Sequence, residues 1–258
     1  MSDRTLPQWD GAAEWYDQNM GERGDPLNRE LLRPLVLEML GDLSGQTLLD
    51  CGCGSGYLTA ELAGRARRVV ATDFAPAFVS LCRRKYAGVV NLEFLEHDLA
   101  APRPLPLADH SMDVVLCKMV LQYVAEIAPF AREARRVLRE SGQALVVVDH
   151  PFHAQFHYAQ RLAGVENPKY PDLAPYFDQS PRTKLSLWGK VQLTFYPRPV
   201  SAYVQAFAAA GLHLIEMREL PEPGAETQVP RVLVLRLGAL RLERPAAGGR
   251  SPAPGPAR

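Results

Sequence analysis

The stretch LLDCGCGSG, residues 48–56, decides the fold. The apolar run TLLD (47–50) is typical of a buried strand, and Leu58 to Ala63 suits a helix that ends at Gly64. Between them, glycines leave the backbone open to a ligand at the carboxyl edge of a parallel sheet, where side chains would block its approach. We therefore predict a ligand-binding loop here rather than a bare turn, with its glycines at Gly52, Gly54 and Gly56.

Strands and helices alternate outward from this loop. Further strands are predicted at 68–73, 91–98, 112–117 and 143–149, and a closing hairpin at 213–220 and 231–237. Helices are predicted at 31–40, 76–86, 127–139 and 200–211, the third ending at Ser141-Gly142. This alternation predicts an α/β protein with a doubly wound, mostly parallel, seven-stranded sheet covered by helices on both faces.

The remaining segments divide the chain into parts. We expect an N-terminal helical cap over 1–44, a binding core over 45–150 and an inserted lid of short helices and loops over 151–199. Residues 200–240 return to the sheet. The tail, 241–258, contains no bulky apolar residue after Leu242 and is expected to be disordered.

Charge and composition narrow the class of partner. The chain has 29 Lys and Arg against 29 Asp and Glu, a formal net charge of zero, which argues against a protein held to nucleic acid or lipid by a general positive field. Four cysteines are too few for a disulfide scaffold, and neither a signal peptide nor a membrane span is predicted. We expect a cytoplasmic protein, as a monomer or a homodimer.

The spacing of the loop indicates the type of ligand. A dinucleotide fingerprint, G-x-G-x-x-G, fails from Gly52 because its third glycine would fall on Tyr57. The pattern is instead D-x-G-x-G-x-G, and Asp50 at the strand end would repel a pyrophosphate but attract an ammonium group. A ligand with an amino-acid end, a ribose and an adenine suits this arrangement.

The loop resembles the first motif of class I methyltransferases that use S-adenosylmethionine (SAM). Further matches follow in the family's order, at Asp73 after the second strand, EHDLA (96–100), DVVLCKMVLQYV (113–124) and REARRVLRESGQALVVVDHPF (132–152). The opening WDGAAEWYDQNMGERGD and the later YFDQSPRT are similar to a bacterial small-molecule subgroup. The resemblance implies a Rossmann-like methyltransferase fold and SAM as the cofactor.

The resemblance also implies roles for single residues. Asp50 would hold the methionine amino group, the loop of Cys51, Gly52, Gly54 and Gly56 would admit its backbone contacts, Asp73 would bind both ribose hydroxyls, and Asp98 with the Leu99 amide would bind adenine. Phe74 would pack either on the adenine or in the core. Cys117 and Lys118 would lie over the methionine, with the ammonium of Lys118 pointing away to solvent or a carboxylate. Tyr16 would make a polar contact, or its helix would merely dock.

Other residues are candidates for acceptor binding and catalysis. His150 ends the fifth strand and is either a general base or a hydrogen-bonding partner of the insertion. Gln122, Tyr123, Phe152, His153 and Tyr176 are candidate substrate contacts, with core packing as the rival role for Tyr123. Arg182 and Arg198 either bind an acidic substrate or are solvated. No carboxylate or cysteine set completes a metal site around His150, His153 and His157, so no metal is predicted.

The predicted reaction is an in-line transfer of methyl from SAM to an oxygen or nitrogen of a small acceptor, in bacterial secondary metabolism. Nucleic-acid methylation is disfavoured because CKMV (117–120) replaces the motif of DNA amino-methyltransferases and the chain lacks a Pro-Cys pair. Aromatic residues of the insertion, including Phe156, Tyr158 and Tyr170, suit a lid over such an acceptor. The alternatives are a non-catalytic SAM-binding subunit and an NAD-dependent oxidoreductase.

Overall fold

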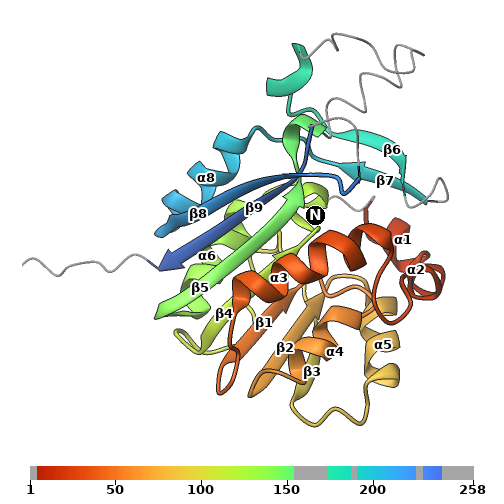
Figure 1. Cartoon of the computed structure of the whole chain (residues 1–258), viewed down its shortest axis with the longest axis vertical. Coiled ribbons are helices and arrows are strands. Elements are labelled where there is room, and N and C mark those ends of the chain that lie inside the picture. The colour runs from red at the N-terminus through yellow and green to blue at the C-terminus, as the bar shows by residue number, and fades with distance from the viewer. Residues whose placement is uncertain (1–4, 154–173, 187–190, 225–228, 240–258) are drawn as a thin grey trace, which may run out of the picture.

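The computed structural model describes residues 5–153, 174–186, 191–224 and 229–239. Its centre is a seven-stranded sheet in the order β3-β2-β1-β4-β5-β9-β8 (Figure 1). The strands are β1 (Thr47–Cys51), β2 (Arg68–Asp73), β3 (Leu92–Glu96), β4 (Met112–Lys118), β5 (Leu138–Asp149), β8 (Leu212–Pro221) and β9 (Pro230–Ala239). The first five strands are mutually parallel and β9 runs antiparallel to both of its neighbours. The predicted doubly wound, mostly parallel sheet and its closing hairpin are confirmed.

Helices cover both faces of this sheet. They are α3 (Arg33–Leu40), α4 (Tyr57–Ala63), α5 (Pro76–Lys85), α6 (Ala128–Val137) and α8 (Val200–Ala209). In β4, Val114 and Leu116 pack with the cluster that contains α3 and α4, whereas Val115 and Cys117 pack with α6 and α8. Because successive side chains of a strand point to opposite faces, the part of a strand that is covered on both sides must be apolar, as residues 114–117 of β4 are.

The N-terminal segment forms the helices α1 (Thr5–Asp10) and α2 (Ala13–Met20), which lie beside α5 (Figure 1). The short π-helix η1 (Asn28–Leu32) follows and continues into α3. Asp17 of α2 pairs with Lys85 of α5 at 2.5 Å, and the Asp10 carboxylate accepts the amide of Ala77 at 2.8 Å. These contacts hold the first two helices against the start and the end of α5.

Two predicted element types differ from the structure. The strand β5 starts at Leu138, before the predicted stop at Ser141-Gly142, because Leu138 pairs with Met112 and the register then shifts to pair Gln143 with Val114. Gly142 allows this irregularity, since a Cβ there would lie 2.9 Å from the Leu138 side chain and 3.0 Å from a backbone oxygen.

The insertion contains strands as well as helix. Besides the 3-10 turn η3 (Ala174–Phe177), it forms an antiparallel hairpin of β6 (Arg182–Ser186) and β7 (Val191–Phe195), where only helices and loops were predicted. The amide of Thr194 in β7 donates to the Gln8 side chain of α1 at 3.2 Å. The predicted aromatic lid residues Phe156, Tyr158 and Tyr170, the residue His157 and the tail 241–258 lie outside the described residues.

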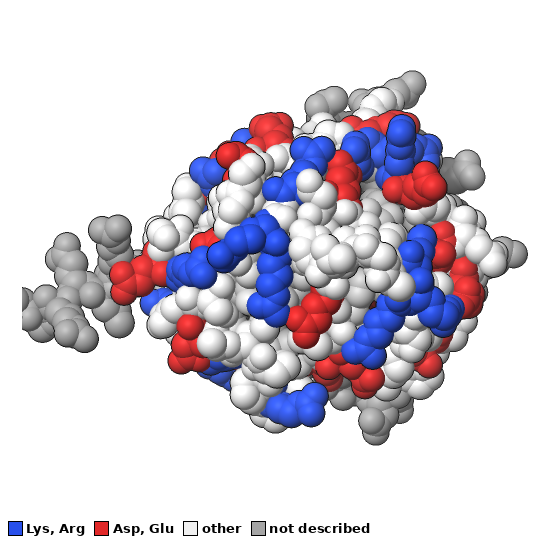
Figure 2. Space-filling view, turned by 90° about the horizontal axis from the view of Figure 1, so that it is seen from below, with Lys and Arg blue, Asp and Glu red and all other residues white. Residues whose placement is uncertain are grey.

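Acidic and basic side chains are interspersed on the surface shown in Figure 2, without a large field of one sign. Within the described ranges, the helices are all too short or too polar to cross a membrane.

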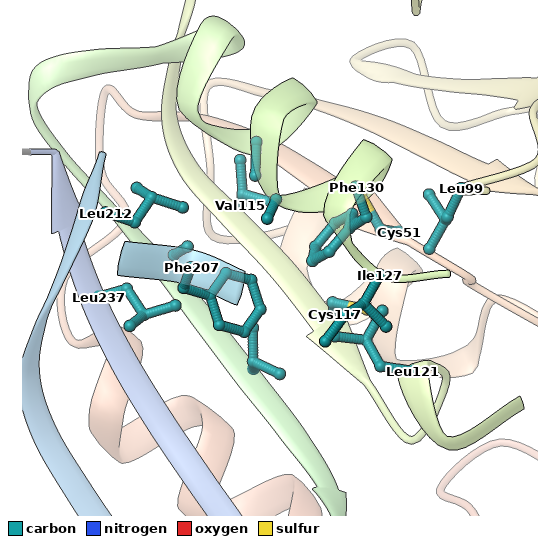
Figure 3. Packing of buried hydrophobic residues seen from close by; sticks show 14 of the residues in the cluster. Cys51, Leu99, Val115, Cys117, Leu121, Ile127, Phe130, Phe207, Leu212 and Leu237 are labelled. Carbon is teal, nitrogen blue, oxygen red and sulfur yellow. The ribbon is translucent and has the colours of Figure 1, made fainter. Parts of the chain in front are cut away.

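The largest buried cluster joins α6 and α8 to the sheet (Figure 3). Phe130 of α6 and Phe207 of α8 meet edge to face, with ring centroids 6.2 Å apart. Leu121 of the 3-10 turn η2 (Leu121–Tyr123) completes this cluster next to Cys117. The core therefore reaches to the carboxyl ends of the strands, where it anchors the segment that follows β4.

Arg198 also anchors the segment that follows β4. Its buried guanidinium donates to the carbonyls of Leu121 at 3.0 Å and Tyr196 at 3.1 Å, and also to those of Val124 and Ala125. The predicted alternatives, an acidic substrate or solvent, are both wrong for this side chain. Arg182 pairs instead with Asp178 at 3.1 Å.

We expect Arg198→Met to destabilise the fold. Several buried carbonyls would lose their donor at about 1–3 kcal/mol each before relaxation, so the free energy of unfolding should fall by roughly 2–4 kcal/mol. Urea denaturation measures this change. As a control, Arg65→Met removes an exposed i,i+4 ion pair and should change stability by less than about 0.5 kcal/mol. Equal effects of the two substitutions would contradict the anchoring role.

Candidate functional site

A cavity opens at the carboxyl ends of β1, β2 and β4, directly over the glycine loop. We call it the glycine-loop cavity. The space within it, counted out to its open mouth, is about 880 Å³, within the range of cofactor sites. Ten of the predicted cofactor and substrate residues line it: Tyr16, Asp50, Gly52, Gly54, Asp73, Phe74, Asp98, Leu99, Lys118 and Tyr123.

The loop adopts backbone conformations that glycine alone accepts without strain. Gly52, Gly54 and Gly56 all have positive φ, at 79°, 54° and 74°. A Cβ at Gly52 would lie 2.3 Å from Val120, so this glycine lets the loop and the segment after β4 approach each other. Gly56 immediately precedes α4 and lies against Cys82 and Tyr86, and it is not part of the cavity wall.

Asp73 ties the loop to the end of β2. One carboxylate oxygen accepts the amide of Gly54 at 2.9 Å and the other accepts that of Ala75 at 3.0 Å. Burial raises the pKa of Asp73 to about 6, although these amides act in the opposite direction. The Phe74 amide is a third donor to this carboxylate, and its remaining acceptor capacity suits the hydroxyls of a diol.

Asp50 lies on the adjacent strand. Its carboxylate accepts the hydroxyl of Thr59 at 2.6 Å, and burial raises its pKa. A buried carboxylate with one neutral donor is best completed by a cation. The carboxylates at the ends of neighbouring strands therefore offer one site for a cationic group and one for a diol.

Aromatic rings from four elements close the cavity. Trp9 of α1 contacts Tyr123 of η2 edge to face, with ring centroids 5.3 Å apart. Tyr16 of α2 contacts Phe78 of α5 in the same way, with ring centroids 5.5 Å apart. Trp9 and Tyr16 also contact each other, with ring centroids 6.0 Å apart. Tyr16 was left open between a polar contact in the site and simple docking of its helix, and the structure places both Tyr16 and Trp9 on the cavity wall.

The sequence predicted that the Lys118 amine points to solvent or to a carboxylate, and the structure contradicts this prediction. Its Nζ lies 2.9 Å from Asn28 Oδ1 and 3.3 Å from the Tyr57 hydroxyl, inside the protein. Neither Asn28 nor Tyr57 was singled out as a functional residue, because they lie far from Lys118 in the sequence and match no motif. Tyr57 is the first residue of α4, and this position after the glycine loop was the only available signal.

A second cavity adjoins the first, and we call it the polar cavity. It shares Trp9, Tyr16, Lys118, Met119 and Tyr123 with the glycine-loop cavity. Its other walls combine apolar and polar side chains: Met20, Leu27, Leu32, Asp25, Asn28, Gln122, Asp149 and Arg231.

Gln122 is buried in the wall of the polar cavity, and its side-chain amide lacks a hydrogen-bond partner among the described residues. A buried unpaired amide costs about 1–3 kcal/mol, so it marks a place where a ligand can supply the missing donor and acceptor.

His150 lies on neither cavity wall. Its Nδ1 accepts the amide of Phe152 at 3.1 Å, so Nε2 carries the hydrogen that it shares with Glu219 at 2.7 Å. Burial lowers the pKa of its imidazole. Both ring nitrogens are occupied and the ring has no free lone pair for a substrate proton, so we do not assign it the role of base.

The remaining predicted residues lie apart from both cavities. Cys51 and Cys117 are buried in the core below the loop. Phe152 and His153 follow His150 and are absent from the two cavity walls, and the Tyr176 hydroxyl accepts the amide of Val200 at 3.2 Å. The described part of the chain contains no cluster of ligands that could hold a metal ion.

Comparison with known proteins agrees with this geometry. A family model described as a methyltransferase domain matches residues 49–146. A probable S-adenosylmethionine-dependent methyltransferase of Mycobacterium tuberculosis is 38% identical over 145 residues, which cover 56% of this chain and 46% of that protein. The chain thus spans about half the length of this curated relative.

Two further proteins match over most of the chain. N-demethylindolmycin N-methyltransferase of Streptomyces griseus is 26% identical over 238 residues, covering 87% of this chain and 95% of that protein. The crystal structure of an S-adenosylmethionine-dependent methyltransferase from Mesorhizobium loti has the same fold, with a TM-score of 0.67 and 20% identity over 89% of this chain and 99% of that chain. Residues 49–146 thus match a methyltransferase domain, and the sheet around them has the fold of S-adenosylmethionine-dependent methyltransferases of known structure.

Proposed function

We propose that the protein binds SAM in the glycine-loop cavity and transfers its methyl group to a small-molecule acceptor in the polar cavity. The observation that carries this proposal is the pair of buried carboxylates, Asp50 and Asp73, that open into one cavity over a glycine loop. When bound, SAM supplies an electrophilic methyl group on a positively charged sulfur.

The donor set fits this cofactor. Asp50 would hold the methionine ammonium group and Asp73 would accept from both ribose hydroxyls. Asp98 would accept from the adenine amino group, and the Leu99 amide would donate to a ring nitrogen. Phe74 lines the cavity, which favours contact with the adenine over simple core packing.

The protein's contribution to the reaction is mainly alignment and exclusion of water. An in-line displacement in which positive charge disappears requires no catalytic triad, and positioning alone can supply ~7–11 kcal/mol. Trp9, Tyr16, Phe78 and Tyr123 surround the cavity with rings that exclude water from the cofactor.

The polar cavity favours a small acceptor over a macromolecule. It is bounded by side chains of the N-terminal helices, of η2 and of the sheet, and its wall includes Gln122, whose buried side-chain amide has no hydrogen-bond partner among the described residues. The interspersed surface charges give no footprint for nucleic acid on the face in Figure 2. We propose an acceptor oxygen or nitrogen on a compact molecule.

The name of the Streptomyces griseus relative, an N-methyltransferase of an indolmycin precursor, supports a role in bacterial secondary metabolism. We propose that this protein has such a role, acts in the cytoplasm and works as a monomer or homodimer. Release of S-adenosylhomocysteine (SAH) in the presence of hydroxylated and amine-bearing aromatic acceptors tests the activity. Binding of SAM without turnover of any acceptor would favour a non-catalytic subunit.

We expect Asp73→Ala to weaken SAH binding by at least about tenfold, since two hydroxyl hydrogen bonds to a charged acceptor, each ≈ 1.5–3 kcal/mol, would be lost. Isothermal titration calorimetry measures the dissociation constant. Asp109→Ala, which removes an exposed carboxylate paired with Arg136, is the matched control and should leave the affinity unchanged. Unaltered affinity in Asp73→Ala would refute the ribose assignment.

SAH affinity should also depend on pH. Ribose hydroxyls donate to the ionised carboxylate, so binding favours the deprotonated form of Asp73, whose pKa is raised to about 6. Affinity should therefore be level above this pH and fall by up to about tenfold per unit below it. Titrations between pH 5 and 8 measure the profile. The part due to Asp73 should vanish in Asp73→Ala, and an identical profile in that variant would assign the effect to another group.

Gln122→Met should separate acceptor binding from cofactor binding. Methionine has a similar volume but no amide, so the Michaelis constant of the acceptor should rise while SAH affinity stays the same. The ligand-free protein should be equally or more stable, because an unpaired buried amide costs about 1–3 kcal/mol. Thermal unfolding and steady-state kinetics measure both, with exposed Gln179→Met as the control. A marked loss of stability in Gln122→Met would contradict the unpaired state of this amide.

A further inference from the structure

Lys118 lies at the boundary between the two cavities. It is the last residue of β4 and lines both the glycine-loop cavity and the polar cavity. Met119, which follows it, has φ of 60°, a conformation that costs a non-glycine residue roughly 1–2 kcal/mol. The backbone is thus held in an unfavourable turn just where the two cavities meet.

Hydrogen bonds fix the direction of the lysine amine. The side-chain nitrogen of Asn28 donates a hydrogen bond to the Asp25 carboxylate at 2.8 Å, and this orients the Asn28 side-chain oxygen towards Lys118. The Tyr57 hydroxyl donates to that same oxygen at 2.5 Å, so the phenol oxygen is an acceptor towards Lys118. Asn28 and Tyr57 therefore use two hydrogens of the amine.

Two hydrogens are all that a neutral amine possesses, and its remaining tetrahedral position is a lone pair. The ammonium form would need a third acceptor, and among the described residues the hydrogen bonds of Nζ go to the two oxygens of Asn28 and Tyr57, with the Tyr57 ring centroid 5.5 Å away. The arrangement therefore satisfies the neutral form fully.

Burial and the neighbouring carboxylates shift the pKa of Lys118 in opposite directions. Burial lowers the pKa of Lys118 to about 8, while the carboxylates of Asp50 and Asp25 raise it. Asp149 and Arg231, on the same cavity wall, are paired with each other. Tyr16 and Tyr57 are neutral phenols whose pKa values are raised by burial.

Bound cofactor would shift this balance further. A methionine ammonium on Asp50 would neutralise one of the two carboxylates that favour the charged lysine, and a sulfonium nearby would add a repelling positive charge. Both effects disfavour the ammonium form of Lys118 when SAM is bound. Since SAH carries the same amino-acid ammonium, the sulfonium charge alone distinguishes SAM from SAH in this respect.

We infer that Lys118 is the general base that accepts the proton of the acceptor during methyl transfer, an inference that rests on the function proposed above. The acceptor's lone pair forms the bond to the methyl carbon, and the carbon–sulfur bond breaks with its electron pair passing to sulfur. The proton on the acceptor oxygen or nitrogen moves to the Lys118 lone pair. The positive charge lost from sulfur thus reappears on the lysine ammonium, which later releases its proton to solvent.

The chain makes a direct test practical, because it contains only five lysines: Lys85, Lys118, Lys169, Lys184 and Lys190. Protein labelled with ¹³C at the lysine Cε positions gives one titrating resonance per lysine, recorded from pH 6 to 11 without ligand, with SAH and with SAM. The resonance missing from Lys118→Gln identifies Lys118. If that variant does not fold, Lys→Arg changes at the other four positions assign it by elimination.

We expect Lys118 to titrate near 8 without ligand and at least about one unit lower with SAM than with SAH. Lys85 is the internal control, since its ion pair with Asp17 raises its pKa. A Lys118 that titrates above about 10 in the SAM complex, or equally in both complexes, would overturn the inference while leaving SAM binding intact. Failure of both ligands to bind would instead refute the proposed function, and this inference with it.

Calorimetry gives a second readout that needs no acceptor. A lysine that loses its proton when SAM binds makes SAM affinity, relative to SAH affinity, rise with pH by up to about tenfold per unit of pKa difference. The ratio of the two dissociation constants cancels effects that both ligands share. Lys118→Arg, which keeps its charge, should bind SAM more weakly relative to SAH, and the ratio of its two dissociation constants should not change with pH. A pH-dependent ratio in this variant would contradict the role of Lys118.

Discussion

The hydrogen bond from the Gly54 amide to the Asp73 carboxylate is the contact on which the site depends. It joins the loop after β1 to the end of β2, and it requires a positive φ at a residue that faces the cavity. Burying a carboxylate is costly, and backbone amides offset part of that cost. The loop is thus held open by a group whose remaining hydrogen-bonding capacity points to a ligand.

A second set of contacts joins distant parts of the chain around the other end of the cavity. Asn28 of η1, Tyr57 of α4 and Lys118 of β4 meet in one network. Arg198 holds the segment after β4 through backbone carbonyls, so this segment cannot move away from the lysine without leaving buried acceptors unpaired. The N-terminal helices and the sheet therefore line both cavities, and Arg198 of the insertion fixes the segment that lies between them.

Residues close to the strand ends were predictable, since parallel strands bring their carboxyl ends to one edge. Asp50, Asp73 and Asp98 needed only the strand pattern and the motif spacing to be assigned to one cavity, and all three line it. His150 met the same criterion and yet lies elsewhere, because Glu219 of β8 and the Phe152 amide occupy its ring. The strand end predicted its position but not its partners.

The sequence by itself determined the alternation of strands and helices, the glycine loop and the acidic residues that follow the strands, because each depends on neighbours within a few positions. The tertiary structure alone decided the hairpin in the insertion, the direction of Lys118, the unpaired amide of Gln122 and the carbonyl contacts of Arg198. These depend on groups brought together from distant parts of the chain. Burial and the available partners, rather than local pattern, then decide which polar group stays charged, which is paired and which is left for a ligand.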